Sequence, residues 1–205
     1  MSKVAKIRLG CYLAVLVGIL AHPLHTIWKY EFSDIPSREF LFQCTVRDPY
    51  DIMRGRYVQL SFDQENVTLP ENRLTNYHRS LEVYAVLKEG EDGFAKIVDL
   101  VTSRDEVPQD GWPLRISSND VWNTNWQPND ENKRISYRVR FPFERYYVNE
   151  KLAPQAEKVI GSALSVDASR KVALKVRILE GGEFAVEDLL VDGRPLREVI
   201  AETAE

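Results

Sequence analysis

The sequence has 205 residues, of which 44% are hydrophobic and 28% are charged, a composition that excludes a wholly disordered chain. Its formal net charge is −4 and no stretch is strongly basic, so the sequence lacks the positive face that nucleic-acid binding requires. The two cysteines, one of them inside an apolar N-terminal run, do not make a disulfide framework.

The N-terminal segment begins with three basic residues and continues as LGCYLAVLVGILAHPLHTIW over residues 9–28, which carry no formal charge. About twenty apolar residues suffice for a helix to cross a bilayer, so residues 1–30 are predicted as a cytoplasmic tip and a single-pass transmembrane anchor. The basic flank predicts a cytoplasmic N-terminus and an extracytoplasmic, periplasmic C-terminal domain, with Trp28 and Tyr30 at the far interface. Two alternatives stay open: a cleaved signal peptide, and a soluble protein whose first helix is buried.

Residues 31–205 are predicted as one mainly β (α+β) domain, built from an antiparallel sheet with one or two short helices. The stretch RGRYVQLSF, residues 54–62, combines a glycine bend with strict alternation. Its apolar residues Val58, Leu60 and Phe62 are expected to share the buried face of a strand.

The remaining elements follow from turn signals and periodicity. Hairpins with glycine-rich turns are predicted over 80–103 and 171–196, and a further strand over 133–143. A helix is predicted over 152–164, because its apolar residues recur at helical spacing after a proline. The Asn- and Asp-rich residues 117–132 are predicted as a long loop.

Two hexapeptides suggest an internal repeat. DGWPLR at 110–115 and DGRPLR at 192–197 differ at one position, and each follows a predicted hairpin. We therefore predict a degenerate duplication of one β unit, with pseudo-repeats at about 40–116 and 133–198 that pack as halves of one sheet system. The alternative is coincidence, because Asp-Gly turns followed by proline are common in unrelated sequences.

The segments RGRYVQLSF, FPFERYYVNEKLAPQAE and VDGRPL resemble, in order and spacing, the GDYXXLXY family of membrane-anchored bacterial proteins. The resemblance spans almost the whole chain and implies an N-terminal anchor, an extracytoplasmic domain, and a gene often placed beside one for a polytopic membrane protein. It implies no established activity. Gly55, Tyr57 and Leu60 keep the family pattern, whereas Arg56 replaces an aspartate and Phe62 replaces a tyrosine. The charge reversal at Arg56 excludes a metal-binding or acid–base role for that position.

No catalytic motif is recognisable, and no cofactor, metal or catalytic residue is predicted. Gly-x-Ser-x-Gly, Ser-x-x-Lys and His-Glu-x-x-His are all missing, and His78 is the one histidine outside the anchor. Cys44 lies in an apolar strand pattern typical of a buried thiol. The Asn- and Asp-rich residues of Asn123–Glu131 offer oxygen ligands for calcium, but their spacing lacks the features of an EF-hand.

Two functions are therefore considered. The first is a non-catalytic accessory module on the outer face of the bacterial cytoplasmic membrane, which binds a multispanning membrane protein. The second is an envelope hydrolase, signal-peptidase-like or of another type. For the first, the candidate binding residues are Arg56, Tyr57, Arg145 and Tyr146, because Arg and Tyr are enriched where interfaces concentrate their energy. The competing interpretation places both tyrosines in the core and both arginines in solvent.

Overall fold

The computed structural model describes residues 3–31, 35–46, 53–54, 57–70, 74, 82–124, 134–163 and 171–203. The chain divides into two compact units, Met1–Pro36 and Ser37–Glu205, and each is described by itself.

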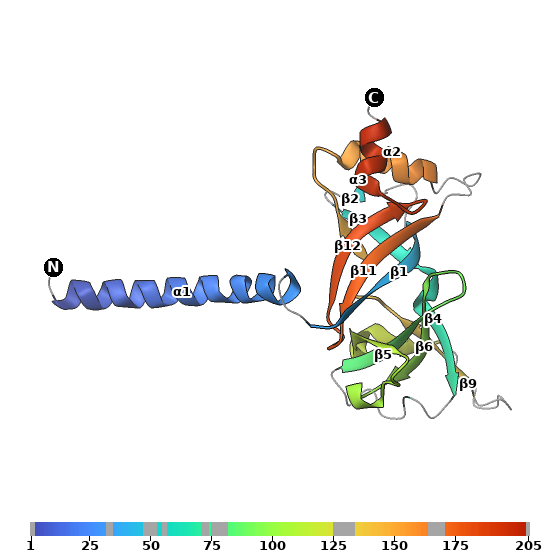
Figure 1. Ribbon diagram of the computed structural model, residues 1–205, viewed down its shortest axis with the longest axis horizontal. Helices are drawn as coiled ribbons and strands as arrows, with labels where there is room; N and C mark the ends of the chain where they lie inside the picture. Colours follow the sequence, from blue (N-terminus) through green and yellow to red (C-terminus); the bar gives the residue numbers. More distant parts are fainter. Residues whose placement is uncertain are drawn as a thin grey trace. The chain divides into compact units, whose positions relative to one another are not determined.

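The first unit contains one long helix, α1 (Lys3–Glu31), drawn in blue in Figure 1. Its segment Gly10–Trp28 is long and apolar enough to cross a membrane, and none of it is buried. Pro23 lies inside the helix, and the ring of His25 stacks on Trp28 with centroids 6.4 Å apart. The predicted apolar helix is thus confirmed, and it is consistent with a signal anchor or a signal sequence.

The second unit is built around one large antiparallel sheet with the strand order β10-β3-β1-β11-β12-β13 and with β2 paired to β3. Figure 1 shows β1, β11 and β12 curving side by side. The alternation predicted for residues 57–62 is confirmed, since Val58, Leu60 and Phe62 are buried while the intervening residues are half-exposed. The strands are β1 (Ser37–Val46), β2 (Met53–Arg54), β3 (Tyr57–Phe62), β10 (Arg145–Tyr147), β11 (Val172–Leu179), β12 (Phe184–Val191) and β13 (Arg194–Pro195).

Two smaller antiparallel sheets complete the β structure. One has the order β4-β9-β8 and the other the order β6-β5-β7. Short 3₁₀ turns at Asp63–Glu65, Arg104–Glu106 and Ser118–Asp120 link β3 to β4, β6 to β7 and β7 to β8, respectively. The strands are β4 (Asn66–Pro70), β5 (Glu82–Glu89), β6 (Ala95–Val101), β7 (Trp112–Ser117), β8 (Val121–Asn123) and β9 (Arg134–Val139).

The turn between β11 and β12 joins the large sheet to the sheet that contains β7. The Arg115 N–H donates to the Gly182 carbonyl at 2.9 Å, and the indole N–H of Trp112 donates to the Ile178 carbonyl at 3.0 Å. Gly182 has a φ of +88° and lies so close to β7 that an added Cβ would stand 3.0 Å from the Arg115 nitrogen. Glycine is therefore required there for both conformation and space.

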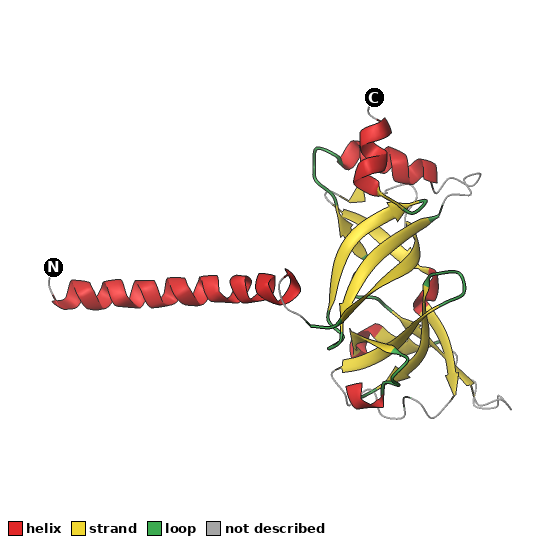
Figure 2. Cartoon of the chain, in the orientation of Figure 1, coloured by secondary structure: helices red, strands yellow, loops and turns green. Residues whose placement is uncertain are grey.

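Two short helices pack against each other at one end of the large sheet, as Figure 2 shows. The helix α2 (Ala153–Ala163) buries Ala156, Val159, Ile160 and Ala163, which confirms the predicted stripe. The helix α3 (Leu196–Thr203) begins inside the second hexapeptide. It is the second of the one or two short helices expected, at a position that the sequence pattern did not predict.

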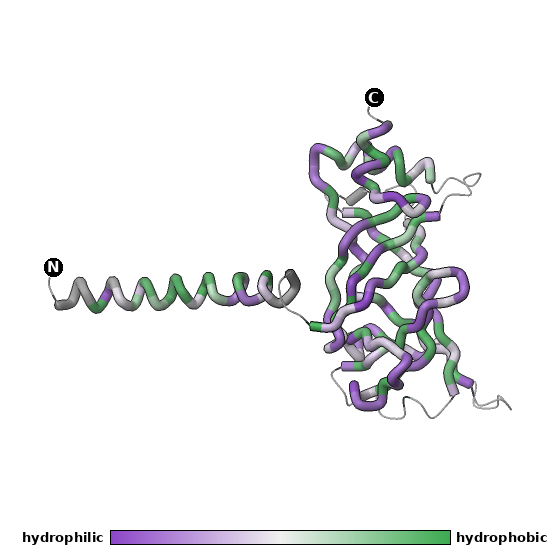
Figure 3. Tube along the Cα trace, viewed as in Figure 1, coloured by the Kyte–Doolittle hydropathy of each residue, from purple (hydrophilic) through white to green (hydrophobic). Residues whose placement is uncertain are grey.

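The core is continuous and rich in phenylalanine. Figure 3 shows how apolar and polar residues alternate along the strands that enclose it. The rings of Phe42, Phe62, Phe141 and Phe143 contact one another with centroids 4.9–6.1 Å apart, and Phe184 contacts Phe143 at 5.3 Å.

The predicted fold class and both predicted hairpins are confirmed. The loop expected over 117–132 differs, since Val121–Asn123 pairs with β9 as the strand β8. The two hexapeptides adopt different structures: β7 pairs with the first strand of its hairpin, whereas β13 pairs with the second and leads into α3. The duplication stays a prediction.

Candidate functional site

The large sheet curls until its strands β10 and β12 approach each other without pairing. The Tyr146 hydroxyl on β10 donates to Oδ1 of Asp188 on β12 at 2.9 Å. Beside this bond, Phe143 packs edge-on against Phe184. In the strand order of the described residues, β10 and β12 are not hydrogen-bonded neighbours. We call this junction the seam.

Asp188 owes its position to a β-bulge. The register slips between Lys175 and Val176, so that Glu187 is an extra residue in β12. A bulge re-aims the side chains next to it. Asp188 is 8% exposed and is the buried charged side chain among the described residues. Besides the Tyr146 hydroxyl, its Oδ1 accepts the Leu189 N–H at 2.9 Å, and its Oδ2 lies 3.5 Å from Arg197.

The neighbourhood of Asp188 changes the acidity of Tyr146. Burial, and then the hydrogen bond and negative charge of Asp188, raise the pKa of the Tyr146 phenol to about 12. The phenol is therefore neutral at physiological pH and serves as a hydrogen-bond donor.

A pocket of about 750 Å³ opens along the seam. Aromatic, aliphatic and charged side chains line it together. Among them, Arg140 forms ion pairs with Asp120 and Glu144 at 3.7 and 3.9 Å. The lining residues are Asp120, Arg140, Phe141, Pro142, Phe143, Glu144, Arg145, Tyr146, Tyr147, Phe184, Val186 and Glu187.

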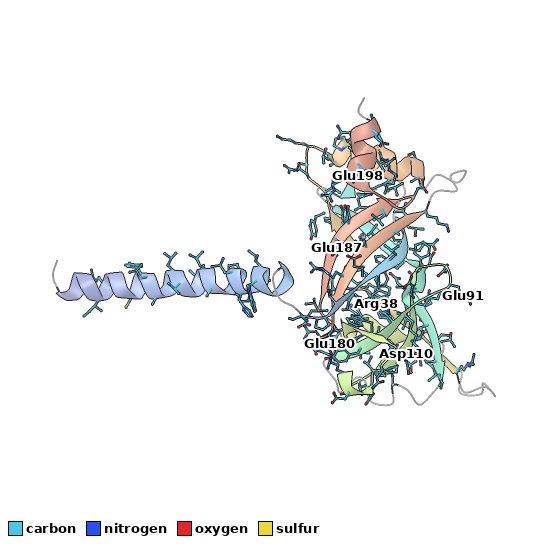
Figure 4. The ribbon with its side chains drawn as sticks, in the orientation of Figure 1. Arg38, Glu91, Asp110, Glu180, Glu187 and Glu198 are labelled. Carbon is cyan, nitrogen blue, oxygen red and sulfur yellow. The ribbon has the colours of Figure 1, made fainter. Side chains whose placement is uncertain are left out.

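A second pocket, of about 550 Å³, shares Glu187 with the first and is also lined by Asp188. Glu187, labelled in Figure 4, contacts Lys175 at 3.1 Å and Arg177 at 2.9 Å, and Lys175 also contacts Glu39 at 2.9 Å. Hydrogen bonding between them raises the pKa of Lys175 and lowers that of Glu39. The two positive and two negative charges of Lys175, Arg177, Glu39 and Glu187 thus balance one another. This group of ion pairs therefore offers a ligand little unpaired charge.

The structure brings some of the predicted binding residues together. Tyr57 and Tyr147 lie opposite each other in the β3–β10 pair with ring centroids 5.8 Å apart. The guanidinium of Arg145 lies over the Tyr57 ring, 5.1 Å from its centroid, and Tyr147 is 67% exposed. We call Tyr57, Arg145 and Tyr147 the Tyr–Arg patch. Arg56 lies outside the described residues.

Tyr146 does not join this patch. It pairs with the buried Val58, and residues that lie opposite each other share one face of a sheet. Tyr57 and Tyr146, which occupy equivalent places in the two Arg-Tyr stretches, therefore lie on opposite faces of the sheet. Sequence reasoning missed Tyr147 and Asp188. The signal for the second was the adjacent Glu-Asp pair, which breaks the alternation of FAVEDLLV.

Cys44, the cysteine of the β domain, is buried. Burial raises the pKa of the Cys44 thiol to about 12, the reverse of what a nucleophilic cysteine needs. Within the described ranges, no group of three or more His, Cys, Asp or Glu side chains could hold a metal ion. His78 and residues 125–131 of the candidate calcium loop lie outside those ranges.

Comparison with known proteins gives one result. A family model described as GDYXXLXY protein matches residues 19–189, most of the chain. No curated protein and no solved structure matches.

Proposed function

Since the chain belongs to the GDYXXLXY family, we propose that it is a non-catalytic, membrane-anchored binding module that partners a multispanning membrane protein. On this proposal α1 stays in the bacterial cytoplasmic membrane, and the β domain stands on its outer, periplasmic side. No feature of the described residues favours the alternative of an envelope hydrolase.

The exposed Tyr–Arg patch carries the proposal of a binding role. Tyrosine supplies a large, partly apolar contact area with few rotatable bonds. Arginine supplies a planar group with several hydrogen-bond donors. Tyr147 leaves two-thirds of its surface in solvent although it lies on a strand. No described carboxylate is within ion-pair distance of Arg145, so its charge is available to an anionic or aromatic surface of a partner.

The proposal of an outer location rests on α1. A helix with an uncharged, unburied stretch such as Gly10–Trp28 needs an apolar solvent, and lipid supplies one. The basic residues Lys3, Lys6 and Arg8 precede that stretch, and positive flanks favour the cytoplasmic side.

Reporter fusions test the orientation. A phosphatase fused after Glu205 should be active, and a fluorescent protein that folds only in the cytoplasm should be dark there. The opposite pattern would contradict the proposed topology. If the N-terminus of the mature protein began after residue 20, the segment would be a cleaved signal.

Co-purification tests the binding role. The full-length chain, extracted in mild detergent, should carry a multispanning protein with it. Changing Arg145→Ala together with Tyr147→Ala should abolish this recovery with little effect on the melting temperature. Arg134→Ala, which removes an exposed arginine from β9, is the matched control and should retain the partner. Retention by the double variant would remove the Tyr–Arg patch from consideration.

A further inference from the structure

The seam exposes two strand edges. The Leu60 N–H donates to the Glu144 carbonyl at 2.8 Å. In an antiparallel pair, the N–H and C=O groups of successive residues point alternately to the two sides of the strand. Since those of Glu144 point toward β3, those of Arg145 and Tyr147 point away from it. On the opposite edge the Leu179 N–H donates to the Glu183 carbonyl at 2.8 Å, so Phe184 and Val186 direct theirs away from β11.

All four outward-facing residues line the same pocket. The strand β13 pairs only with Leu190 and Val191 within the described residues and leaves this part of β12 uncovered. An uncovered pair of edges is a template for strand addition.

The directions of β10 and β12 allow a single strand to be added between them. Each step from β10 through β3, β1 and β11 to β12 is antiparallel. Four reversals make β10 and β12 parallel to each other. One added strand can therefore run antiparallel to both, and two inter-strand spacings, about 9.6 Å, are the width it needs.

The seam also limits how far such a strand extends. At one end the Asp188 carboxylate already accepts the outward Leu189 N–H and is tied to Tyr146. Because the Leu189 N–H is already bonded to Asp188, an added strand cannot pair with β12 beyond the bulge. The pocket therefore offers pairing to a short segment, next to Arg145–Tyr147 on one side and Phe184–Val186 on the other.

We propose that the seam receives an extended segment of the partner protein as an added strand between β10 and β12. This inference rests on the proposed function, since it names the way in which the partner is held. Alternate residues of the segment are apolar and pack on Phe143 and Phe184. The residue beside Arg145 on the outer face is acidic, because that guanidinium has no described carboxylate partner.

Photo-crosslinking from both edges tests the proposal in cells that make the full-length chain. Benzoylphenylalanine replaces Tyr147 in one variant, Val186 in a second and Tyr57 in a third. Val98, which is 42% exposed on β6 of a different sheet, is the control position. The expected result is that Tyr147 and Val186 label the same short stretch of one membrane protein, with apolar residues at alternate positions, while Val98 does not.

The other outcomes are distinct. If Tyr57 and Tyr147 label a partner and Val186 does not, the binding module stands and strand addition is wrong. If Val186 labels a second copy of this chain, the seam is a self-association edge, and the proposal is overturned. If no position labels a membrane protein, both the module and the inserted strand are refuted.

A backbone variant gives an independent measurement. Val186→Pro removes an N–H that faces the pocket and makes no bond to β11, so the sheet should tolerate it as edge strands tolerate proline. We expect at least tenfold less co-purified partner and a melting temperature within a few degrees of wild type. Wild-type recovery of the partner by a folded Val186→Pro chain would overturn strand addition, and crosslinking decides the matter if that variant does not fold.

Discussion

The hydrogen bond between Tyr146 and Asp188 should hold the two edges of the large sheet together. Tyr146→Phe removes the hydroxyl and keeps the ring in place. The lost bond joins a phenol to a buried carboxylate at 2.9 Å, and hydrogen bonds to charged groups contribute about 1.5–3 kcal/mol. Because Asp188 keeps its bond to the Leu189 N–H and its contact with Arg197, we expect the lower part of that range, about 1.5–2 kcal/mol.

A double-mutant cycle isolates this interaction. Urea unfolding of wild type, Tyr146→Phe, Asp188→Ala and the double variant gives the coupling free energy, which should be at least about 1 kcal/mol. The melting temperature of Tyr146→Phe should fall by about 3–8 °C for a domain of this size. Tyr57→Phe removes a hydroxyl from the outer face of the sheet and should change stability by less than about 0.5 kcal/mol. A coupling free energy below about 0.5 kcal/mol would refute the role of the bond in closing the seam.

The pH dependence of stability provides a second test of the same bond. The folded-state pKa of Tyr146 is raised from 10.0 to about 12, so folding favours the neutral phenol. Its contribution is complete below about pH 10 and is lost as the pH rises to about 12. The titration of tyrosinate absorbance in wild type should include the Tyr146 phenol at this high pKa, and Tyr146→Phe should show one high-pKa phenol fewer. An unchanged number of high-pKa phenols in that variant would contradict the assignment.

Further predictions concern the core, the buried thiol and one turn. Leu60→Ala should lower the free energy of unfolding by about 3–4 kcal/mol, because Leu60 is 1% exposed, whereas Gln59→Ala on the other face should change it by less than about 0.5 kcal/mol; equal losses in urea titrations would contradict the strand alternation. Folding raises the pKa of the Cys44 thiol from 9.0 to about 12, so stability should fall as the pH rises across that interval, and Cys44→Ala should remove this part of the alkaline loss seen in melting curves. Gly182→Ala should cost about 1–3 kcal/mol, since φ is +88° and an added Cβ would stand 3.0 Å from a β7 nitrogen. Gly193 also has a positive φ, +79°, but no atom lies near the position of an added Cβ, so Gly193→Ala should cost less stability in the same thermal melts. Equal losses from the two substitutions would mean that the contact of Gly182 with β7 is unimportant.

Local patterns in the sequence determined the elements that depend on nearest neighbours. An uncharged run of about twenty residues predicts α1, and the alternation around Leu60 predicts β3 and its buried face. Glycine-rich turns predict both long hairpins, and a stripe at helical spacing predicts α2. These features are short-range, so each could be inferred from residues close together in the chain.

The seam was decided by the tertiary structure alone. Tyr146 and Asp188 are 42 residues apart, and their contact depends on how four successive strand pairings curl the sheet. A single-residue bulge at Glu187 then turns Asp188 toward Tyr146, and a one-residue slip in register changes the face on which every later side chain lies. In the same way, the register of the β3–β10 pair places Tyr57 and Tyr146 on opposite faces of the sheet. Sequence can supply the residue types at such a junction, but the pairing register and curvature that bring them together are collective properties of the folded sheet.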